Sequence, residues 1–226
     1  MTIAHYTLSE LQSDAATGLS YRLRQPAPPQ PTRLLVLLHG VGGNETNLLD
    51  LAHGVDAQTL VVLVRGPLQI GPQQFAWFQV RFTANGPQIA PDEAERSRTQ
   101  LIALVQQLQQ DFGIAPGSSV IAGFSQGGIM SAGVALSAPH CVRGFGLLSG
   151  RILPELEPHL ANKEQLAGLR AFVGHGEHDS KLPVQWAHRS DALLNDLGVP
   201  HALHLYPIDH SISAAMHADF IAWLAG

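Results

Sequence analysis

Three side chains in this sequence could together carry out nucleophilic catalysis, and each follows a predicted strand. Ser125 lies in the pattern Gly123-Phe124-Ser125-Gln126-Gly127, Asp179 follows a short strand at 171–173, and His210 precedes the last predicted helix. A serine hydroxyl is a weak nucleophile at neutral pH and needs an imidazole to take its proton. The imidazole in turn needs a carboxylate that fixes its tautomer and stabilises its charged form. These residue types therefore predict a serine nucleophile with a base and an acid.

The residues around Ser125 strengthen this prediction, because the five-residue pattern alone is only suggestive. An apolar run at 119–122 suits a buried parallel strand, and a helix is predicted from Gln126 onward. Ser125 would then occupy a sharp strand-to-helix turn that raises its hydroxyl into solvent, a nucleophile elbow. A side chain at Gly123 or Gly127 would collide with neighbouring backbone in such a turn.

Other residues compete for the roles of acid and base. Asp209 and Asp219 are alternative acids, and His210 is one of twelve histidines. The position directly after a strand favours Asp179, and the position between the last strand and the last helix favours His210. The resulting chain order of serine, aspartate and histidine is typical of the α/β-hydrolase sheet.

Two backbone N–H groups are predicted to hold an oxyanion beside Ser125. Gln126 would offer its N–H from the start of the helix, and Val41, in the loop after the strand at 34–38, would offer a second. Donors placed in this way stabilise the negative charge that develops on a carbonyl oxygen during nucleophilic attack.

The elements that must position these residues alternate between strand and helix. Strands are predicted at 34–38, 60–64, 119–123, 142–148, 171–173 and 202–206, and helices at about 92–112, 183–197 and 211–224 as well as after Gln126. Alternation of this kind predicts an α/β fold, a mostly parallel sheet with helices on both faces. Ligands of such sheets bind beyond the carboxyl ends of the strands, where the three side chains lie.

Several boundaries of the fold also follow from the sequence. Short strands at 3–9 and 19–24 predict an antiparallel N-terminal edge, and Asp92 with Glu95 predicts a capping box on the helix that follows. The chain has 226 residues, 45% of them hydrophobic, and we expect residues 1–226 to form a single domain. The connection at 151–168 is too short for a separate cap domain.

Composition excludes several classes of function. Charged residues make up 14% of the chain and the net charge is −5, without a stripe of Lys or Arg, which argues against nucleic-acid partners. No apolar stretch is long enough for stable membrane insertion. The N-terminus lacks the features of a signal peptide, and Cys141 is the only cysteine, so we expect a cytoplasmic protein.

Six segments together carry a resemblance to a known family. They are 38–44, 65–67, 76–78, 123–128, 175–179 with Pro183, and 209–212. With these segments the sequence resembles the phospholipase/carboxylesterase family of small α/β-hydrolases, which includes acyl-protein thioesterases and bacterial carboxylesterases. The resemblance implies the α/β-hydrolase fold, a triad of Ser125, Asp179 and His210, and an oxyanion hole at Val41 and Gln126.

The sequence departs from the family pattern at two positions. Gln79 stands where members often have Asp, which leaves the substrate class open. Asp209 stands where members usually have Gly before the histidine, which would alter the electrostatics of His210. Neither departure removes a residue of the triad.

Apolar residues near the predicted site could bind an acyl chain. The segment at 66–90 is rich in apolar residues. These residues could form an acyl-binding wall, close the hydrophobic core or make a homodimer contact. The candidate substrate-binding residues are Leu68, Phe75, Trp77, Phe78 and Leu182. His175 and His178 beside Asp179 could suggest zinc, but they lie in a turn rather than on one helix face, and we expect no metal or cofactor.

The sequence therefore predicts a serine carboxylesterase that hydrolyses short to medium acyl esters through an acyl-enzyme. Thioesters and lysophospholipids are further candidate substrates implied by the resemblance. Two alternatives remain open: a serine amidase or acyltransferase that uses the same triad, and a catalytically silent binding protein with a hydrolase fold.

Overall fold

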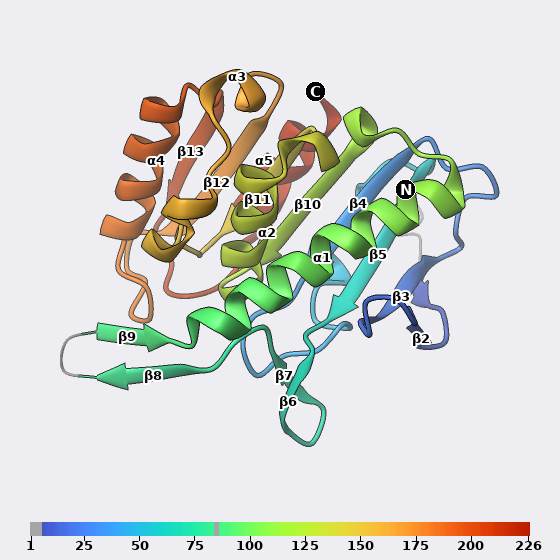
Figure 1. Cartoon of the computed structure of the whole chain (residues 1–226), viewed down its shortest axis with the longest axis horizontal. Helices are drawn as coiled ribbons and strands as arrows, with labels where there is room; N and C mark the ends of the chain where they lie inside the picture. Colours follow the sequence, from blue (N-terminus) through green and yellow to red (C-terminus); the bar gives the residue numbers. More distant parts are fainter. Residues whose placement is uncertain (1–5, 84–85) are drawn as a thin grey trace.

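The computed structural model describes residues 6–83 and 86–226 and is organised around a mostly parallel sheet (Figure 1). Its strands lie in the order β1-β3-β5-β4-β10-β11-β12-β13, and β2 pairs with β3. The parallel strands are β4 (Arg33–Leu38), β5 (Thr59–Arg65), β10 (Ser119–Phe124), β11 (Gly144–Leu148), β12 (Arg170–Gly176) and β13 (His201–Tyr206). The predicted α/β architecture is confirmed.

An antiparallel edge precedes these strands, as predicted. It consists of β1 (Thr7–Leu8), β2 (Gln12–Ser13) and β3 (Ser20–Gln25), and β3 runs antiparallel to β5. Residues 3–5 of the predicted first strand lie outside the described residues.

Helices cover both faces of the sheet (Figure 1). One face carries α1 (Pro91–Phe112), α2 (Gln126–Ser137) and α4 (Gln185–Leu197), and the other carries α5 (Ala214–Ala225) with η1 (Asp50–Ala52). Short turns of helix complete the chain: η2 (Pro116–Ser118), η3 (Pro139–Cys141), η4 (Pro154–His159) and α3 (Lys163–Leu166).

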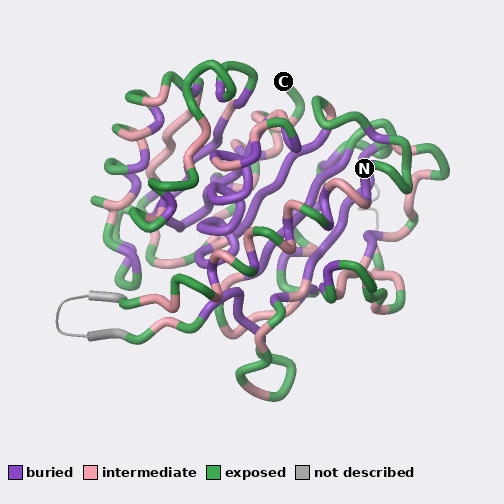
Figure 2. Tube along the Cα trace, in the orientation of Figure 1, coloured by how far each residue is buried: buried purple, intermediate pink, exposed green. Residues whose placement is uncertain are grey.

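Two hydrophobic cores lie between the sheet and the helices, one on each face. Because successive side chains of a strand point to opposite faces, Leu34 and Val36 pack on the side of α1 and α2, whereas Leu35 and Leu37 pack on the side of α5. The central strands are buried along their length (Figure 2). This explains why they read in the sequence as continuous apolar runs.

The segment at 66–90 forms two hairpins that the sequence did not predict. They are β6 (Leu68–Gly71) with β7 (Gln74–Ala76), and β8 (Val80–Thr83) with β9 (Gly86–Ile89), and both extend away from the main sheet (Figure 1). β6 is largely exposed and so lacks the alternation of apolar and polar residues by which a half-buried strand is recognised.

The start of α1 also differs from the prediction. The N-cap residue is Ala90, which makes no side-chain capping bond, and Pro91 fills the first helical turn. Glu95 instead forms an ion pair with Arg98, so the predicted capping box is wrong. Proline suits this position because its missing N–H would have no intrahelical acceptor there.

The connection from β11 to β12 contains only η4 and α3, so there is no separate cap domain, as predicted. Among the described residues, no helix combines the length and the apolar character that crossing a membrane requires.

Candidate active site

Ser125 occupies a strained turn between β10 and α2. Its backbone has φ 54° and ψ −117°, a conformation that residues with a side chain rarely adopt. A Cβ atom at Gly127 would lie 2.0 Å from the Leu38 carbonyl oxygen, and one at Gly123 would lie 2.4 Å from the backbone of Gly127. Only glycine fits at these two positions, and this close packing holds the turn in place.

A chain of hydrogen bonds connects Ser125, His210 and Asp179. The His210 Nε2 atom lies 2.9 Å from the Ser125 Oγ atom, and its Nδ1 atom lies 2.7 Å from the Asp179 Oδ2 atom. Because Nδ1 donates to the carboxylate, Nε2 is left to accept the proton of the serine hydroxyl. The structure thus brings together the three side chains singled out from the sequence.

The Asp179 carboxylate is buried and fully hydrogen-bonded. Its Oδ1 atom accepts from the backbone N–H groups of Lys181 and Leu182, at 2.9 and 2.8 Å, which leaves Oδ2 for His210. His175 lies beneath this turn and contacts the Leu182 carbonyl oxygen through Nε2 at 2.7 Å. Burial lowers the pKa of His175 more than the Leu182 carbonyl and the Asp179 carboxylate raise it, and the ring supports the acid loop through its contact with Leu182.

Asp209 joins the loop that carries the acid to the loop that carries the base. Its Oδ1 atom accepts from the backbone N–H groups of Ser180 and His210, both at 2.7 Å. These two bonds lower the pKa of the Asp209 carboxyl. A glycine at this position could not make them, so the departure from the family pattern adds a connection between the two loops.

The loop after β4 lies against the turn that carries Ser125. A Cβ atom at Gly40 would lie 3.3 Å from the Ser125 Cβ atom, which shows how closely the loop approaches the turn. The Val41 N–H makes no hydrogen bond to any described residue, and the Gln126 N–H, at the start of α2, has no intrahelical acceptor. Both residues line the cavity beside Ser125.

Three of the residues predicted to bind substrate lie outside this cavity. Phe75 pairs through its backbone with Gly42 and Gly43, and the Trp77 indole N–H donates to the His39 carbonyl oxygen at 2.9 Å. They therefore support the loop that contains Val41, and Trp77 is fully buried in the core. Leu68 belongs to the β6–β7 hairpin and does not line the cavity either.

A buried carboxylate at Glu45 anchors the far end of the same loop. Arg65 binds it with two hydrogen bonds, at 2.6 and 2.8 Å, and Arg22 adds a third at 3.0 Å. Burial raises the pKa of Glu45, but the bonds from the two arginines outweigh this effect and hold the pKa at about 2.

We predict that Glu45→Gln lowers the free energy of unfolding at neutral pH by about 2–3 kcal/mol, because it leaves two arginines without their carboxylate. The folded pKa of about 2 lies below the unfolded value of about 4.3, so the carboxylate stabilises the fold above that range. The stability difference between wild type and variant should shrink as the pH falls from about 4.5 to about 2.

Urea unfolding of both proteins across this pH range measures the effect. Glu10→Gln, which removes an exposed carboxylate, serves as the control and should change little at any pH. A difference that stays constant down to pH 2 would contradict the assigned role of Glu45.

The cavity beside Ser125 has a volume of about 530 Å³, which suits a small ligand. Phe78 and Leu182 line it, as the sequence predicted. The Gln126 side chain holds one wall of the cavity in place. Its amide oxygen accepts from the backbone N–H of Trp77, and its amide nitrogen donates to the Phe78 carbonyl oxygen. The full lining comprises Gly40, Val41, Phe78, Val80, Ile89, Phe124, Ser125, Gln126, Ile129, Arg151, Ser180, Lys181, Leu182 and His210.

The sequence prediction missed several residues of this lining. Ile129 follows the nucleophile by one turn of α2, and Arg151 lies three residues after the end of β11, so both positions belong to the same edge of the sheet. That placement is the signal by which they could have been found. Gln79, in contrast, is exposed and is not part of the lining.

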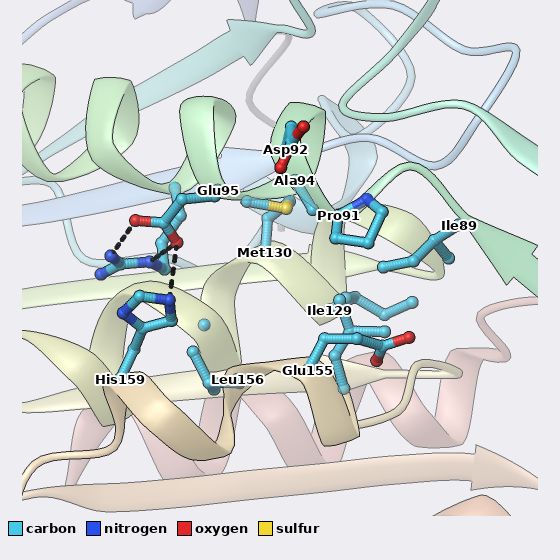
Figure 3. Close-up of a pocket in the computed structure, with 13 residues that line it drawn as sticks. Ile89, Pro91, Asp92, Ala94, Glu95, Ile129, Met130, Glu155, Leu156 and His159 are labelled. Atoms are coloured by element: carbon cyan, nitrogen blue, oxygen red, sulfur yellow. Dashed lines mark hydrogen bonds and ion pairs between the residues drawn. The ribbon is translucent and has the colours of Figure 1, made fainter.

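A second cavity, which Figure 3 shows, adjoins the first, and Ile89 and Ile129 line both. In it Glu95 contacts both Arg98 and His159 (Figure 3). Arg98 is thus neutralised by its neighbour, and this cavity offers no group comparable to Ser125.

The chain is similar to known proteins of one family. A family model described as phospholipase/carboxylesterase matches residues 25–225. Acyl-protein thioesterase 1 of Kluyveromyces lactis is 30% identical over 184 residues, which cover 75% of this chain and 79% of that protein. Acyl-protein thioesterase 1 of Emericella nidulans is 27% identical over 199 residues, which cover 77% and 80% of the two chains.

Solved structures share the architecture. A carboxylesterase from Mesorhizobium loti superimposes with a TM-score of 0.81 at 24% identity, over 96% of this chain and 100% of that chain. The Bacillus cereus carboxylesterase gives a TM-score of 0.77 at 21% identity, over 92% and 93% of the two chains. Together with the family match, these likenesses confirm the α/β-hydrolase fold.

Proposed function

Because the chain belongs to the phospholipase/carboxylesterase family, we propose that it is a serine carboxylesterase that acts through an acyl-enzyme. The observation that carries the proposal is the hydrogen-bond chain from the Ser125 Oγ atom through His210 to Asp179, with distances of 2.9 and 2.7 Å. Such a chain activates a hydroxyl that would otherwise be a poor nucleophile.

In the proposed reaction, Ser125 attacks the ester carbonyl while the His210 Nε2 atom takes the hydroxyl proton. The negative charge that forms on the carbonyl oxygen is held by the Val41 and Gln126 N–H groups, each worth about 3–4 kcal/mol of transition-state stabilisation. His210 then returns its proton to the leaving alcohol. A water molecule then attacks the acyl carbonyl while the same nitrogen takes its proton. That proton passes to the Ser125 Oγ atom as the acyl–Oγ bond breaks and the acid leaves, and Asp179 stabilises the charged imidazole in both steps.

Short to medium acyl esters are the substrates we propose, because the cavity is small and no cap domain covers it. Thioesters are a second candidate, supported by relatives that are named acyl-protein thioesterases. Lysophospholipids are a third. The reaction needs no metal or cofactor. A cytoplasmic location and a homodimer contact through residues 66–90 remain predictions.

The test is labelling with a fluorophosphonate, followed by kinetics with p-nitrophenyl esters of increasing chain length. We expect a covalent adduct on Ser125 and the highest kcat/KM with short or medium chains. An unlabelled protein without esterase activity would favour the silent binding protein. Hydrolysis of anilides at rates comparable to esters, or acyl transfer to added alcohols in preference to water, would favour the amidase or acyltransferase.

A further inference from the structure

Arg151 is a buried cation without a partner in the wall of the cavity that contains Ser125. It is 5% exposed, yet its guanidinium forms no hydrogen bond or ion pair with any described residue. Burial lowers the pKa of this guanidinium and Glu155 raises it, but an arginine remains charged at physiological pH. Its guanidinium nitrogens are not fully enclosed by protein, so their N–H groups remain open to the cavity and to a ligand bound there.

The position of the Arg151 side chain is fixed by an aromatic ring. Its Cζ atom lies 4.5 Å from the centre of the Trp186 ring on α4. Stacking of this kind holds the plane of the guanidinium in place and leaves the N–H groups at its edge free to donate. The planar arrangement of these donors matches the two oxygens of a carboxylate or of a phosphate.

The charges around the cavity favour an anion. Arg151 and Lys181 are cationic, and the lining contains no acidic residue, although the whole chain has a net charge of −5. The adjoining cavity differs, because its lining includes Asp92, Glu95 and Glu155 (Figure 3). The charged side chains that line the cavity beside Ser125 are thus cationic, while the carboxylates of Asp179 and Asp209 lie outside the lining and are occupied by hydrogen bonds.

We propose that Arg151 binds a carboxylate or phosphate group of the substrate, so that the preferred ester carries an anionic group within reach of the cavity wall. The inference rests on the proposed function, since it places that group on the ester that Ser125 attacks. The preferred substrates are then anionic esters, a class to which neutral acyl esters do not belong.

The experiment compares anionic esters with neutral esters of similar size. On the alcohol side, 4-acetoxybenzoate and 4-acetoxyphenyl phosphate are each compared with neutral 4-acetoxybenzamide. On the acyl side, monomethyl adipate is compared with its neutral amide, methyl adipamate. We expect wild type to prefer at least one anionic ester, and the preferred member shows whether the group is a carboxylate or a phosphate and on which side it lies.

The variant Arg151→Gln should reduce this preference, measured as a ratio of kcat/KM values, by about 10- to 100-fold, which is the range for one charged hydrogen-bonding partner. Arg151→Lys, which keeps the charge but loses the planar donors, should retain part of the preference. Arg189→Gln is the matched control, because Arg189 also stacks on Trp186, at 4.7 Å, but is exposed and does not line the cavity. It should keep the wild-type ratio.

Two results would overturn the inference. One is a wild-type enzyme that hydrolyses the neutral esters but shows no preference for any anionic one. The other is an Arg151→Gln variant that keeps the wild-type ratio, or whose loss of preference is matched by Arg189→Gln, since in that case the Arg151 guanidinium does not bind the anionic group. A wild-type protein that hydrolyses none of the esters and is not labelled by a fluorophosphonate would instead refute the proposed function itself.

Discussion

Replacing Ser125 by alanine is expected to lower kcat for ester hydrolysis by about 10⁴- to 10⁶-fold. The variant keeps the cavity, the two proposed oxyanion donors and the pair of His210 and Asp179, but it lacks the oxygen atom that forms the acyl-enzyme in the proposed mechanism. Residual rates come from water attacking an ester held in the site, and this route lacks covalent catalysis.

Single-turnover and steady-state kinetics with a p-nitrophenyl ester measure the loss, and mass spectrometry after fluorophosphonate treatment locates the adduct. Ser131→Ala is the matched control, because Ser131 lies on the same helix but donates its hydroxyl to the carbonyl oxygens of Gly128 and Gly146. That variant should stay active and be labelled. Ester hydrolysis at the wild-type rate by Ser125→Ala would refute the mechanism.

The fold was predictable because its central strands are buried on both faces. Leu34 to Leu38 and Leu60 to Val64 are almost entirely apolar, and helices separate the strands that follow. The right-handed connection of parallel strands then leaves few possible arrangements. Because polar residues at the strand ends all fall on one edge of such a sheet, Ser125, Asp179 and His210 could be placed together before their distances were known.

The wall of the cavity was not predictable in the same way. Trp77 and Phe78 are adjacent apolar residues, yet Trp77 is in the core and only Phe78 faces the cavity. Their orientation depends on hydrogen bonds to the Gln126 side chain, which lies 48 positions from Phe78 and 49 from Trp77 in the sequence. Contacts of that range leave no periodic signal in the segment itself, and the same holds for the stacking of Arg151 on Trp186.

The second large effect concerns stability and is expected from Gly127→Ala. A Cβ atom at this position would lie 2.0 Å from the Leu38 carbonyl oxygen and 2.6 Å from that of His39. Both obstacles are backbone atoms at the end of a central buried strand, so neither can move without a shift of β4 or of α2. We expect a destabilisation of more than about 4 kcal/mol, which is exceptional for a single methyl group and typical of severe steric conflict. The variant should be largely unfolded or insoluble at 37 °C.

Gly133→Ala, on the same helix, is the matched control. Its added Cβ atom would meet only the Arg98 side chain, at 3.8 Å, which is an ordinary contact. Alanine is also the better helix former, by about 1 kcal/mol, so this variant should be as stable as wild type or more stable. Thermal and urea unfolding of the two variants therefore separate helix propensity from close packing. A Gly127→Ala variant with the unfolding free energy of wild type would contradict the close packing of the Ser125 turn against β4. The position of Ser125 beside Val41 depends on that packing.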